Sequence, residues 1–314
     1  MGMGLELYRS SKAVQELYNE IDGILDFSLT KLIFEGPEKE LEQTINSQPA
    51  IMATSLACLE ALKELNQSDT CQPTALAGHS LGEYTSLVVS GALDLADGMR
   101  LVRERGRLMQ EASEKHPGSM AAIIGLDEIS VEEICLETGA EVANINGGDQ
   151  IVISGDRVCV ARAVDMSSVR GARKAIPLSV SGAFHSSLMA SAREGLISAI
   201  ENINFQDPVT PIVANSTSMP LTTAEEVKGE LLTQLCNCVQ WKKSVSCMID
   251  SGVTSFIEFG PGKVLASLIK RIGSTPAYQD RHVEVMNVAD LSSARKVAEA
   301  SIRGTPAGRP LTAI

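Results

Sequence analysis

The sequence predicts an α/β fold in which a large domain with a mostly parallel sheet carries an inserted, ferredoxin-like small domain. Two observations predict this architecture. Short apolar runs alternate with helical segments along most of the 314 residues, as in parallel sheets whose two faces are covered by helices. Between residues 118 and 180 the order of elements changes to β-α-β-β-α-β, which is the order of the split βαβ unit.

The amino-terminal third predicts helices followed by one buried strand. Apolar residues recur at spacings of three and four over residues 5–65, and breaks are expected at Gly36-Pro37 and Gln48-Pro49 because proline interrupts a helix. A strand over residues 74–77 then runs into a glycine-flanked turn and a short helix. A second helix is expected over residues 95–114.

The remaining elements follow the same two periodicities. In the small domain we expect strands over 120–124, 141–146, 150–154 and 175–180, and helices over 131–137 and 157–169. The large domain resumes with a helix over 185–203, a strand over 211–215, helices over 224–236 and 244–251, a strand over 255–258 and a helix over 263–272. The predicted domains are 1–117 with 181–295 (large, discontinuous), 118–180 (small) and 296–314 (a disordered tail).

Composition and charge exclude several classes of protein. The net charge is −12 at pH 7, whereas a nucleic-acid-binding protein needs a basic surface. No stretch reaches the roughly 18 apolar residues that span a bilayer, and the charged amino terminus is unlike a signal peptide. The seven cysteines contain no C-x-x-C pair, so neither a zinc site nor a disulfide framework is predicted. We therefore expect a cytoplasmic protein that binds no nucleic acid, membrane or metal. We further expect a monomer that needs no cofactor.

A serine in the turn after the first strand is the candidate nucleophile. Gly78-His79-Ser80-Leu81-Gly82 matches G-x-S-x-G, in which a serine sits on a strained strand-to-helix turn that small neighbours make possible. The amide of Leu81 would face the negative charge that develops on an acyl oxygen. A chance match in a glycine-rich turn is the alternative, but the strand before it and the helix after it favour a catalytic serine.

A serine hydroxyl needs a base at neutral pH, and the chain has four histidines. His185 closely follows the last strand of the small domain, the kind of strand end where α/β sheets place functional side chains. His79 neighbours the serine, so we expect its side chain to leave the turn in another direction and to serve packing or hydrogen bonding. His116, at a helix end, and His282, in a charged stretch, are expected on the surface.

One arginine is predicted to point inward from the helix over 95–114. Arg105 falls within the apolar arc of this helix, whereas its other arginines fall on the opposite side. The residues three and four positions away are all apolar: Leu101, Val102, Leu108 and Met109. A buried guanidinium needs an anion. The anion is either an internal carboxylate, which periodicity alone favours, or a substrate carboxylate, which would indicate half-thioesters such as malonyl.

These motifs resemble those of the malonyl-CoA:acyl carrier protein transacylases, an acyltransferase family, in order and in spacing over most of the chain. The segments that carry the resemblance are Gly78-His79-Ser80-Leu81-Gly82-Glu83-Tyr84, Val102-Arg103-Glu104-Arg105-Gly106, Gly182-Ala183-Phe184-His185, Val239-Gln240-Trp241 and Glu258-Phe259-Gly260-Pro261-Gly262-Lys263. The family fold is a hydrolase-like large domain beside a ferredoxin-like small one, in agreement with the element order.

The resemblance implies a malonyltransferase that moves malonyl from malonyl-CoA to the phosphopantetheine thiol of acyl carrier protein, in fatty acid or polyketide synthesis. It implies that Ser80 is acylated, that His185 accepts and returns the proton, and that Arg105 binds the malonyl carboxylate. Gln234 would orient the histidine through its backbone carbonyl, in place of the aspartate of a triad. Phe184 would fit a preference for malonyl over methylmalonyl.

One departure from the family concerns the amino terminus. Family members begin with a buried strand and a Gly-Gln-Gly-Ser-Gln loop whose glutamine provides a second oxyanion donor, whereas this sequence opens at Met1-Gly2-Met3-Gly4. We therefore expect an exposed sheet edge where that strand would lie. If the chain is complete, one donor fewer should also slow acylation by on the order of 100-fold or more.

A partner surface and two other functions complete the expectations. Acyl carrier proteins are acidic, so a basic surface is expected near the cleft despite the net negative charge. Arg173, Lys174, Lys242 and Lys243 are the candidates, with an ordinary solvated face as the alternative. The other functions left open are a thioesterase or esterase that uses the same turn, and a truncated, inactive remnant that binds acyl carrier protein.

Overall fold

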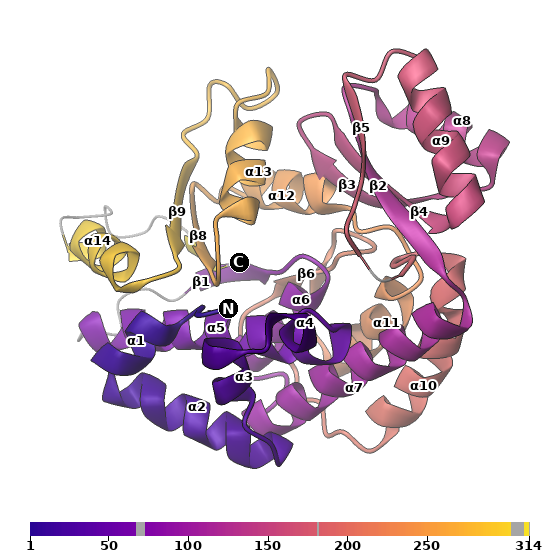
Figure 1. Cartoon of the computed structure of the whole chain (residues 1–314). Coiled ribbons are helices and arrows are strands. Elements are labelled where there is room, and N and C mark those ends of the chain that lie inside the picture. Colours follow the sequence, from indigo (N-terminus) through magenta and orange to yellow (C-terminus); the bar gives the residue numbers. More distant parts are fainter. Residues whose placement is uncertain (67–72, 181, 303–310, 314) are drawn as a thin grey trace.

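The computed structural model describes residues 1–66, 73–180, 182–302 and 311–313, with a large α/β body and a smaller sheet beside it (Figure 1). The large sheet has the strand order β7 (Pro220–Leu221), β6 (Ile212–Val213), β1 (Pro73–Ala77), β10 (Leu311–Ala313), β8 (Ser255–Phe259) and β9 (Glu284–Val288). Neighbouring strands pair in parallel except β6 and β7 at one edge. The mostly parallel sheet predicted from the sequence is confirmed.

Helices cover both faces of this sheet. One face packs on α5 (Thr44–Leu65), α6 (Leu81–Val89) and α7 (Leu95–Lys115), and the other on α12 (Trp241–Asp250) and α13 (Val264–Gly273). Strand β1 shows the reason, because Leu76 joins the core on the first face and Ala77 the core on the second. Further helices are α1 (Leu5–Ser10), α2 (Lys12–Leu25), α3 (Leu29–Glu35), α4 (Glu38–Leu41), α10 (Ala190–Glu201), α11 (Ala224–Gln234) and α14 (Leu291–Ile302). Within the described ranges, no helix combines the length and the apolar content that a membrane crossing requires.

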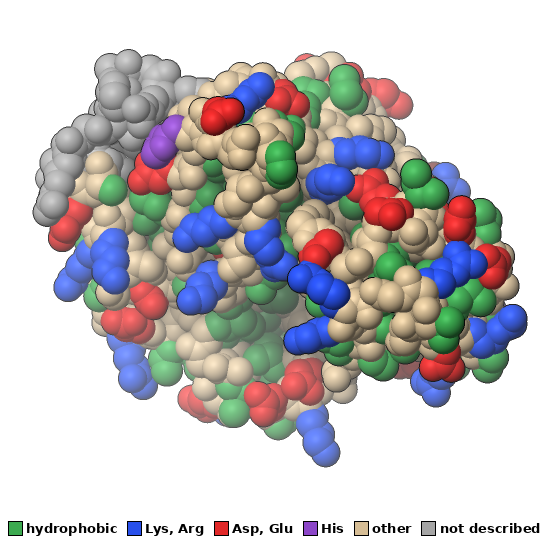
Figure 2. Space-filling model, turned by 90° about the horizontal axis from the view of Figure 1, so that it is seen from above, with side chains coloured by type: hydrophobic (Ala, Val, Ile, Leu, Met, Phe, Trp, Pro, Cys, Tyr) green, Lys and Arg blue, Asp and Glu red, His purple; other side chains and the backbone are tan. Residues whose placement is uncertain are grey.

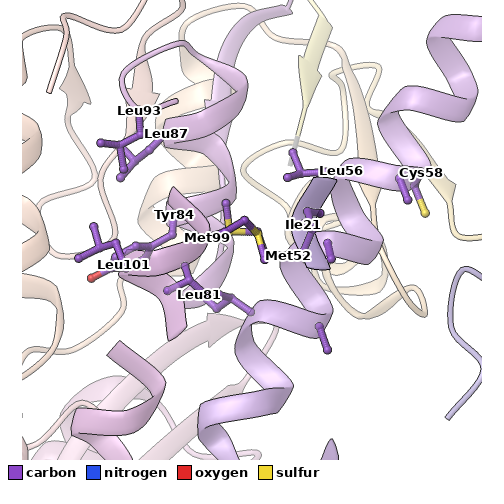
Figure 3. Packing of buried hydrophobic residues seen from close by; sticks show 14 of the residues in the cluster. Ile21, Met52, Leu56, Cys58, Leu81, Tyr84, Leu87, Leu93, Met99 and Leu101 are labelled. Atoms are coloured by element: carbon purple, nitrogen blue, oxygen red, sulfur yellow. The ribbon is translucent and has the colours of Figure 1, made fainter. Parts of the chain in front are cut away.

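The core between α5, α6 and α7 fixes α6 from its first residue. Figure 3 shows Leu81 and Tyr84 of α6 in the same core as Met52 of α5 and Met99 of α7. Tyr84, Met52 and Met99 are fully buried, and Leu81 is 9% exposed. Because Ser80 immediately precedes this helix, packing of α6 also holds the serine in place.

Helix α5 continues through Pro49, so the break expected at Gln48-Pro49 is wrong. Proline removes a single donor from the interior of α5, and Pro49, Ala50 and Ala53 are all buried against neighbouring elements. Tertiary packing therefore outweighs the local cost of the proline. The other predicted break, at Gly36-Pro37, is confirmed because it separates α3 from α4.

The small domain has the element order predicted from the sequence. It consists of β2 (Gly118–Ile124), α8 (Glu128–Thr138), β3 (Glu141–Gly147), β4 (Gln150–Asp156), α9 (Arg157–Val169) and β5 (Lys174–Pro177). The strands form an antiparallel sheet in the order β3-β4-β2-β5, with α8 and α9 packed on one face. The other face presents Met120, Ala122 and Val152 to Phe184, which follows the small domain in the chain. This face therefore lines the space between the two sheets.

The chain that returns from the small domain differs from its prediction. The helix expected over 185–203 begins only with a 3-10 turn at Ser187–Met189 and continues as α10. His185 lies before it and has a φ of 56°, in the left-handed region that a right-handed helix cannot contain. The histidine is thus carried by a bend between two elements.

The described parts of the C-terminal segment, residues 296–302 and 311–313, form regular elements where a disordered tail was expected over 296–314. Helix α14 runs to Ile302, and Leu311–Ala313 form β10 in the middle of the large sheet, while residues 303–310 and 314 lie outside the described part. In β10, Ala313 pairs with Leu76 of β1 and Leu311 pairs with Ser255 of β8. The exposed sheet edge expected from the amino-terminal departure is therefore wrong, because the chain's own C-terminal strand fills the position.

Candidate active site

Ser80 sits at the sharp turn between β1 and α6. Its φ of 52° and ψ of −102° lie outside the regions that L-residues favour, so the backbone is strained at this residue. The turn can close because Gly78 has no side chain: a Cβ there would come within 1.9 Å of the carbonyl carbon of Gly82. The G-x-S-x-G segment thus forms the strand-turn-helix geometry of a nucleophilic serine.

The serine hydroxyl contacts the imidazole of His185. Ser80 Oγ and His185 Nε2 are 2.7 Å apart, and His185 Nδ1 is 2.9 Å from the backbone carbonyl oxygen of Gln234. A carbonyl can only accept, so Nδ1 carries the proton and Nε2 presents its lone pair to the serine. The imidazole is therefore held in the tautomer that a general base requires.

His185 is neutral at physiological pH. Its side chain is nearly inaccessible, and burial, together with the positive charge of Arg105, lowers its pKa from 6.5 to about 3. The hydrogen bond to the Gln234 carbonyl acts in the opposite direction but is the weaker influence. A lone pair is thus available on Nε2 without prior deprotonation.

Arg105 points into the site, as its position on α7 predicts. The side chain is 1% exposed; Nη2 donates to Ser80 Oγ at 3.0 Å and to Gln234 Oε1 at 3.1 Å, and Nη1 donates to Gln48 Oε1. Among the described residues, no carboxylate lies within 4.0 Å of this guanidinium. The internal salt bridge, one of the two interpretations of the sequence, does not form. The described hydrogen-bond partners of this buried cation are neutral groups, namely Gln48, Ser80 and Gln234.

These groups open onto a cavity of about 520 Å³ between the two sheets. Ser80, Arg105 and Phe184 line it from the large domain, and Met120 and Asn144 from the small one. Figure 2 shows the molecule hollowed on this face, with hydrophobic side chains within the hollow and Lys and Arg side chains along its rim. The size and the apolar lining suit a small organic substrate fixed by few polar contacts.

The amide of Leu81 is the expected oxyanion donor. It belongs to the first residue of α6, where a helix offers no carbonyl partner to its N–H groups, and Leu81 lines the cavity beside Ser80. The positive end of the helix dipole lies at the same place. An acyl oxygen bound next to the serine can therefore accept a hydrogen bond from this amide.

The remaining histidines lie where the sequence predicts. His79 leaves the turn toward the small domain, with Nε2 at 2.9 Å from Asn146 Oδ1 and its ring near that of Trp241. Burial lowers its pKa, so this histidine is neutral as well. His116 and His282 are exposed. The structure thus brings only His185 into hydrogen-bond contact with the serine.

Three polar residues of the site escape the sequence analysis. Asn215 Oδ1 accepts from the backbone N–H of Ser80 at 2.6 Å, Glu83 is fully buried behind the turn, and Gln48 contacts Arg105. Asn215 is the last residue of the strand expected over 211–215, and the end of a strand in an α/β sheet is a usable signal for a functional position. Glu83 and Gln48, both on helices, carry no comparable signal in the sequence because their partners are distant in the chain.

Comparison with known proteins agrees with this geometry. The acyl transferase domain model matches residues 1–300. A malonyl CoA-acyl carrier protein transacylase from Bacillus subtilis is 42% identical over 277 residues, which cover 87% of this chain and 86% of that protein. An acyl-carrier-protein-S-malonyltransferase from Bartonella henselae has a similar crystal structure, with a TM-score of 0.89 and 36% identity over 96% of this chain and 95% of that one.

A further solved structure shows a relative with its partner. A malonyl-transacylase in complex with a type II PKS acyl-carrier protein matches with a TM-score of 0.89 and 35% identity, covering 96% of this chain and 95% of that one. Domain model, sequence relatives and structures all extend over both domains. The chain belongs to the malonyl-CoA:acyl carrier protein transacylase family of acyl transferases.

Proposed function

We propose that this protein transfers the malonyl group from malonyl-CoA to the phosphopantetheine thiol of acyl carrier protein through a malonyl-serine at Ser80. The observation that carries the proposal is the position of Arg105, whose Nη2 is 3.0 Å from Ser80 Oγ and which has no carboxylate partner in the described structure. An acyl group that ends in a carboxylate supplies the missing anion when its carbonyl is at the serine. The site therefore selects a dicarboxylic half-thioester.

Acylation follows from the contacts of the serine. Ser80 Oγ attacks the thioester carbonyl while its proton moves to His185 Nε2, and the Leu81 N–H donates to the resulting oxyanion. The C–S bond then breaks, and His185 returns the proton to the coenzyme A thiolate. Transfer to acyl carrier protein is the same sequence in reverse, with the pantetheine thiol giving its proton to His185 as its sulfur attacks the ester.

The geometry of the catalytic pair, or dyad, of Ser80 and His185 favours a transferase over a thioesterase. His185 is oriented by the Gln234 carbonyl and not by a carboxylate, so imidazolium is less stabilised than in a triad of the hydrolase type. The Arg105 guanidinium opposes that charge further. A weaker base favours a thiol over water as the acceptor, because a thiol loses its proton far more readily. Phe184 lines the cavity beside the serine, where it limits the space next to the acyl group.

Basic side chains of the small domain and of α12 are proposed to receive the acidic carrier protein. Lys174 and Lys243 are exposed, whereas Arg173 pairs with Asp149 and Lys242 with Glu128. Pairing reduces the net positive potential of the last two, so Lys174 and Lys243 contribute most to the attraction. The six described cysteines are unpaired, which fits a reducing compartment such as the cytoplasm.

Intact-mass measurement after mixing with malonyl-CoA tests the function. We expect a malonyl adduct that forms with wild-type protein, is absent in Ser80→Ala, and disappears when holo acyl carrier protein is added, with malonyl appearing on the carrier. Continuous release of malonate without the carrier would instead identify a hydrolase. Folded wild-type protein that forms no adduct with fresh malonyl-CoA would identify the remnant.

A further inference from the structure

Glu83 is a buried carboxylate next to the nucleophile that the mechanism above does not use. It lies in the first turn of α6, three residues after Ser80, and is fully buried. Its Oε1 accepts from the backbone N–H of Asn215 at 2.9 Å and from Asn215 Nδ2 at 3.1 Å, and its Oε2 accepts from Gln234 Nε2 at 2.6 Å. In each of these three hydrogen bonds the partner donates and a carboxyl oxygen of Glu83 accepts.

The two partners of Glu83 hold the two halves of the dyad. Asn215 Oδ1 accepts from the Ser80 N–H at 2.6 Å, and Asn215 Nδ2 also donates to the Gly78 carbonyl at 2.7 Å. Gln234 Nε2 donates to the Ser80 carbonyl at 2.9 Å, while the Gln234 backbone carbonyl accepts from His185 Nδ1. One carboxylate therefore connects the strained serine turn with the group that orients the base.

Glu83 also decides which end of the Gln234 amide faces Arg105. Because Gln234 Nε2 donates to Glu83 and to the Ser80 carbonyl, its Oε1 is left to accept from Arg105 Nη2 at 3.1 Å. A group at position 83 that donates would favour the reversed amide, which would turn an NH₂ toward the guanidinium. The orientation of the amide thus depends on an acceptor at position 83.

We propose that Glu83 is a positioning residue that keeps the Ser80 hydroxyl and the His185 imidazole at hydrogen-bond distance by fixing Asn215 and Gln234. The proposal rests on the function proposed above, because it concerns the same serine and histidine. Burial and the nearby Glu230 raise the pKa of Glu83 well above its ordinary value, and the opposing effects of the Asn215 and Gln234 hydrogen bonds and of the Arg105 charge are smaller. What Glu83 contributes to Asn215 and Gln234 is therefore the acceptor geometry of its two carboxyl oxygens.

A second buried carboxylate provides a matched control. Glu230 is 5% exposed, and it accepts from the backbone N–H of Ser216 at 2.8 Å and from the Ser216 hydroxyl. None of its described hydrogen bonds is with Ser80, His185, Asn215 or Gln234. Glu83→Gln and Glu230→Gln each replace a buried carboxylate by an isosteric amide, so a purely structural role predicts similar effects for both.

The test measures the reactivity of Ser80 with a small neutral fluorophosphonate, which needs neither malonyl nor Arg105. We expect Glu83→Gln to slow labelling by on the order of 100-fold, the cost of a misplaced catalytic group, while Glu230→Gln labels at the wild-type rate. Thermal unfolding of both variants shows whether the loss follows stability. The downfield proton resonance of His185 Nδ1–H should shift or broaden in Glu83→Gln alone.

Labelling of folded Glu83→Gln at the wild-type rate would overturn the proposal, as would equal slowing in both variants. If Glu83→Gln does not fold, Asn215→Ala provides a second test, because it removes one of the two residues that Glu83 holds in place. The proposal predicts slower labelling of this variant, and an unchanged rate would also overturn it. Wild-type protein that is labelled at Ser80 yet forms no malonyl adduct would refute the proposed function while leaving this comparison valid.

Discussion

At the scale of single residues, the chemistry depends on a cation and a base that are buried together. Arg105 and His185 both lie within reach of Ser80 Oγ, the first at 3.0 Å and the second at 2.7 Å. The guanidinium disfavours protonation of the imidazole, so the histidine is unprotonated and a weak base. A malonyl carboxylate that neutralises Arg105 would strengthen the base only when the correct acyl group is bound.

Replacing Arg105 by alanine should separate malonyl from acetyl transfer. Loss of a charge-assisted hydrogen bond of about 1.5 to 3 kcal/mol predicts a roughly 10- to 150-fold decrease in kcat/KM for malonyl-CoA. Acetyl-CoA has no carboxylate to lose, so its slow transfer should change much less. Arg103→Ala on the same helix is the control, because that guanidinium binds the Leu25 carbonyl and the Phe27 ring away from the cavity. Equal losses for both acyl groups would contradict the carboxylate-binding role.

The rate of acylation should not fall near pH 6.5, where an ordinary histidine becomes protonated. His185 acts as a base only when unprotonated, and its pKa is lowered to about 3, so protonation inactivates it only in strongly acidic solution. We expect kcat/KM for malonyl-CoA to stay level from about pH 8 to about pH 5 and to fall below that. In Arg105→Ala this fall should move to higher pH, because the positive neighbour is gone. A wild-type midpoint near 6.5 would show that the imidazole is not desolvated.

The sequence predicts the residues of the site that a motif or a helical face marks. Ser80 stands in G-x-S-x-G, and Arg105 lies on an apolar face where a charge is unexpected. Asn215 and Glu83 carry no such mark, because their roles arise from contacts between residues more than 130 positions apart. Glu83 in particular looks like an ordinary first-turn acid of a helix until its burial is known.

At the scale of elements, the turn between β1 and α6 depends more on Gly78 than on Gly82. A Cβ at Gly78 would lie 1.9 Å from the Gly82 carbonyl carbon, whereas a Cβ at Gly82 would meet no atom within 4 Å. The two glycines of the same motif are therefore predicted to differ in their tolerance of a side chain.

Gly78→Ala and Gly82→Ala form a matched pair for that prediction. We expect Gly78→Ala to lower the free energy of unfolding by on the order of 4 kcal/mol or to prevent folding, because backbone must move to admit the methyl group. Gly82→Ala should be neutral or stabilising by about 0.5 to 1 kcal/mol, since alanine loses less entropy in a helix. Urea unfolding of both variants measures the difference, and equal free energies would contradict this description of the turn.

Helix α5 shows why element boundaries are harder to predict than element types. Periodicity identifies the helical segment, but the proline at position 49 predicts a break that does not occur. The local rule counts one lost hydrogen bond, whereas α5 is buried between α2, α6, α7 and α14, and that packing is not visible in a window of sequence. The continuous helix in turn places Gln48 beside Arg105.

At the scale of the whole molecule, the small domain is connected to the serine turn by backbone as well as side chains. Ile145 of β3 donates to the Val239 carbonyl, and Val239 donates to Ala143. The next residue, Gln240, donates to the backbone carbonyl of Asn215, whose side chain accepts from the Ser80 amide. The cavity between the domains thus has walls that are joined near the nucleophile, a long-range arrangement that the element order alone does not predict.

The central position of β10 gives the last prediction. Leu311–Ala313 pair in parallel with both β1 and β8. These three residues therefore join the strand that leads into the serine turn to the strand that contains Glu258. Sequence patterns miss so short a strand, because three residues show no periodicity and the pairing is contributed by distant segments. Without β10, backbone donors and acceptors of β1 and β8 would face each other unpaired within the sheet.

Thr312→Pro and Thr312→Val test that pairing at one position. Proline lacks the N–H that a central strand donates and should lower the free energy of unfolding by about 1 to 3 kcal/mol, the cost of buried backbone groups left without partners. Valine keeps the backbone donor and favours strands, so it should leave the unfolding temperature unchanged. Because β1 ends at the serine turn, the proline variant should also lose acylation rate. Identical melting curves for the two variants would mean that β1 and β8 do not depend on the C-terminal strand.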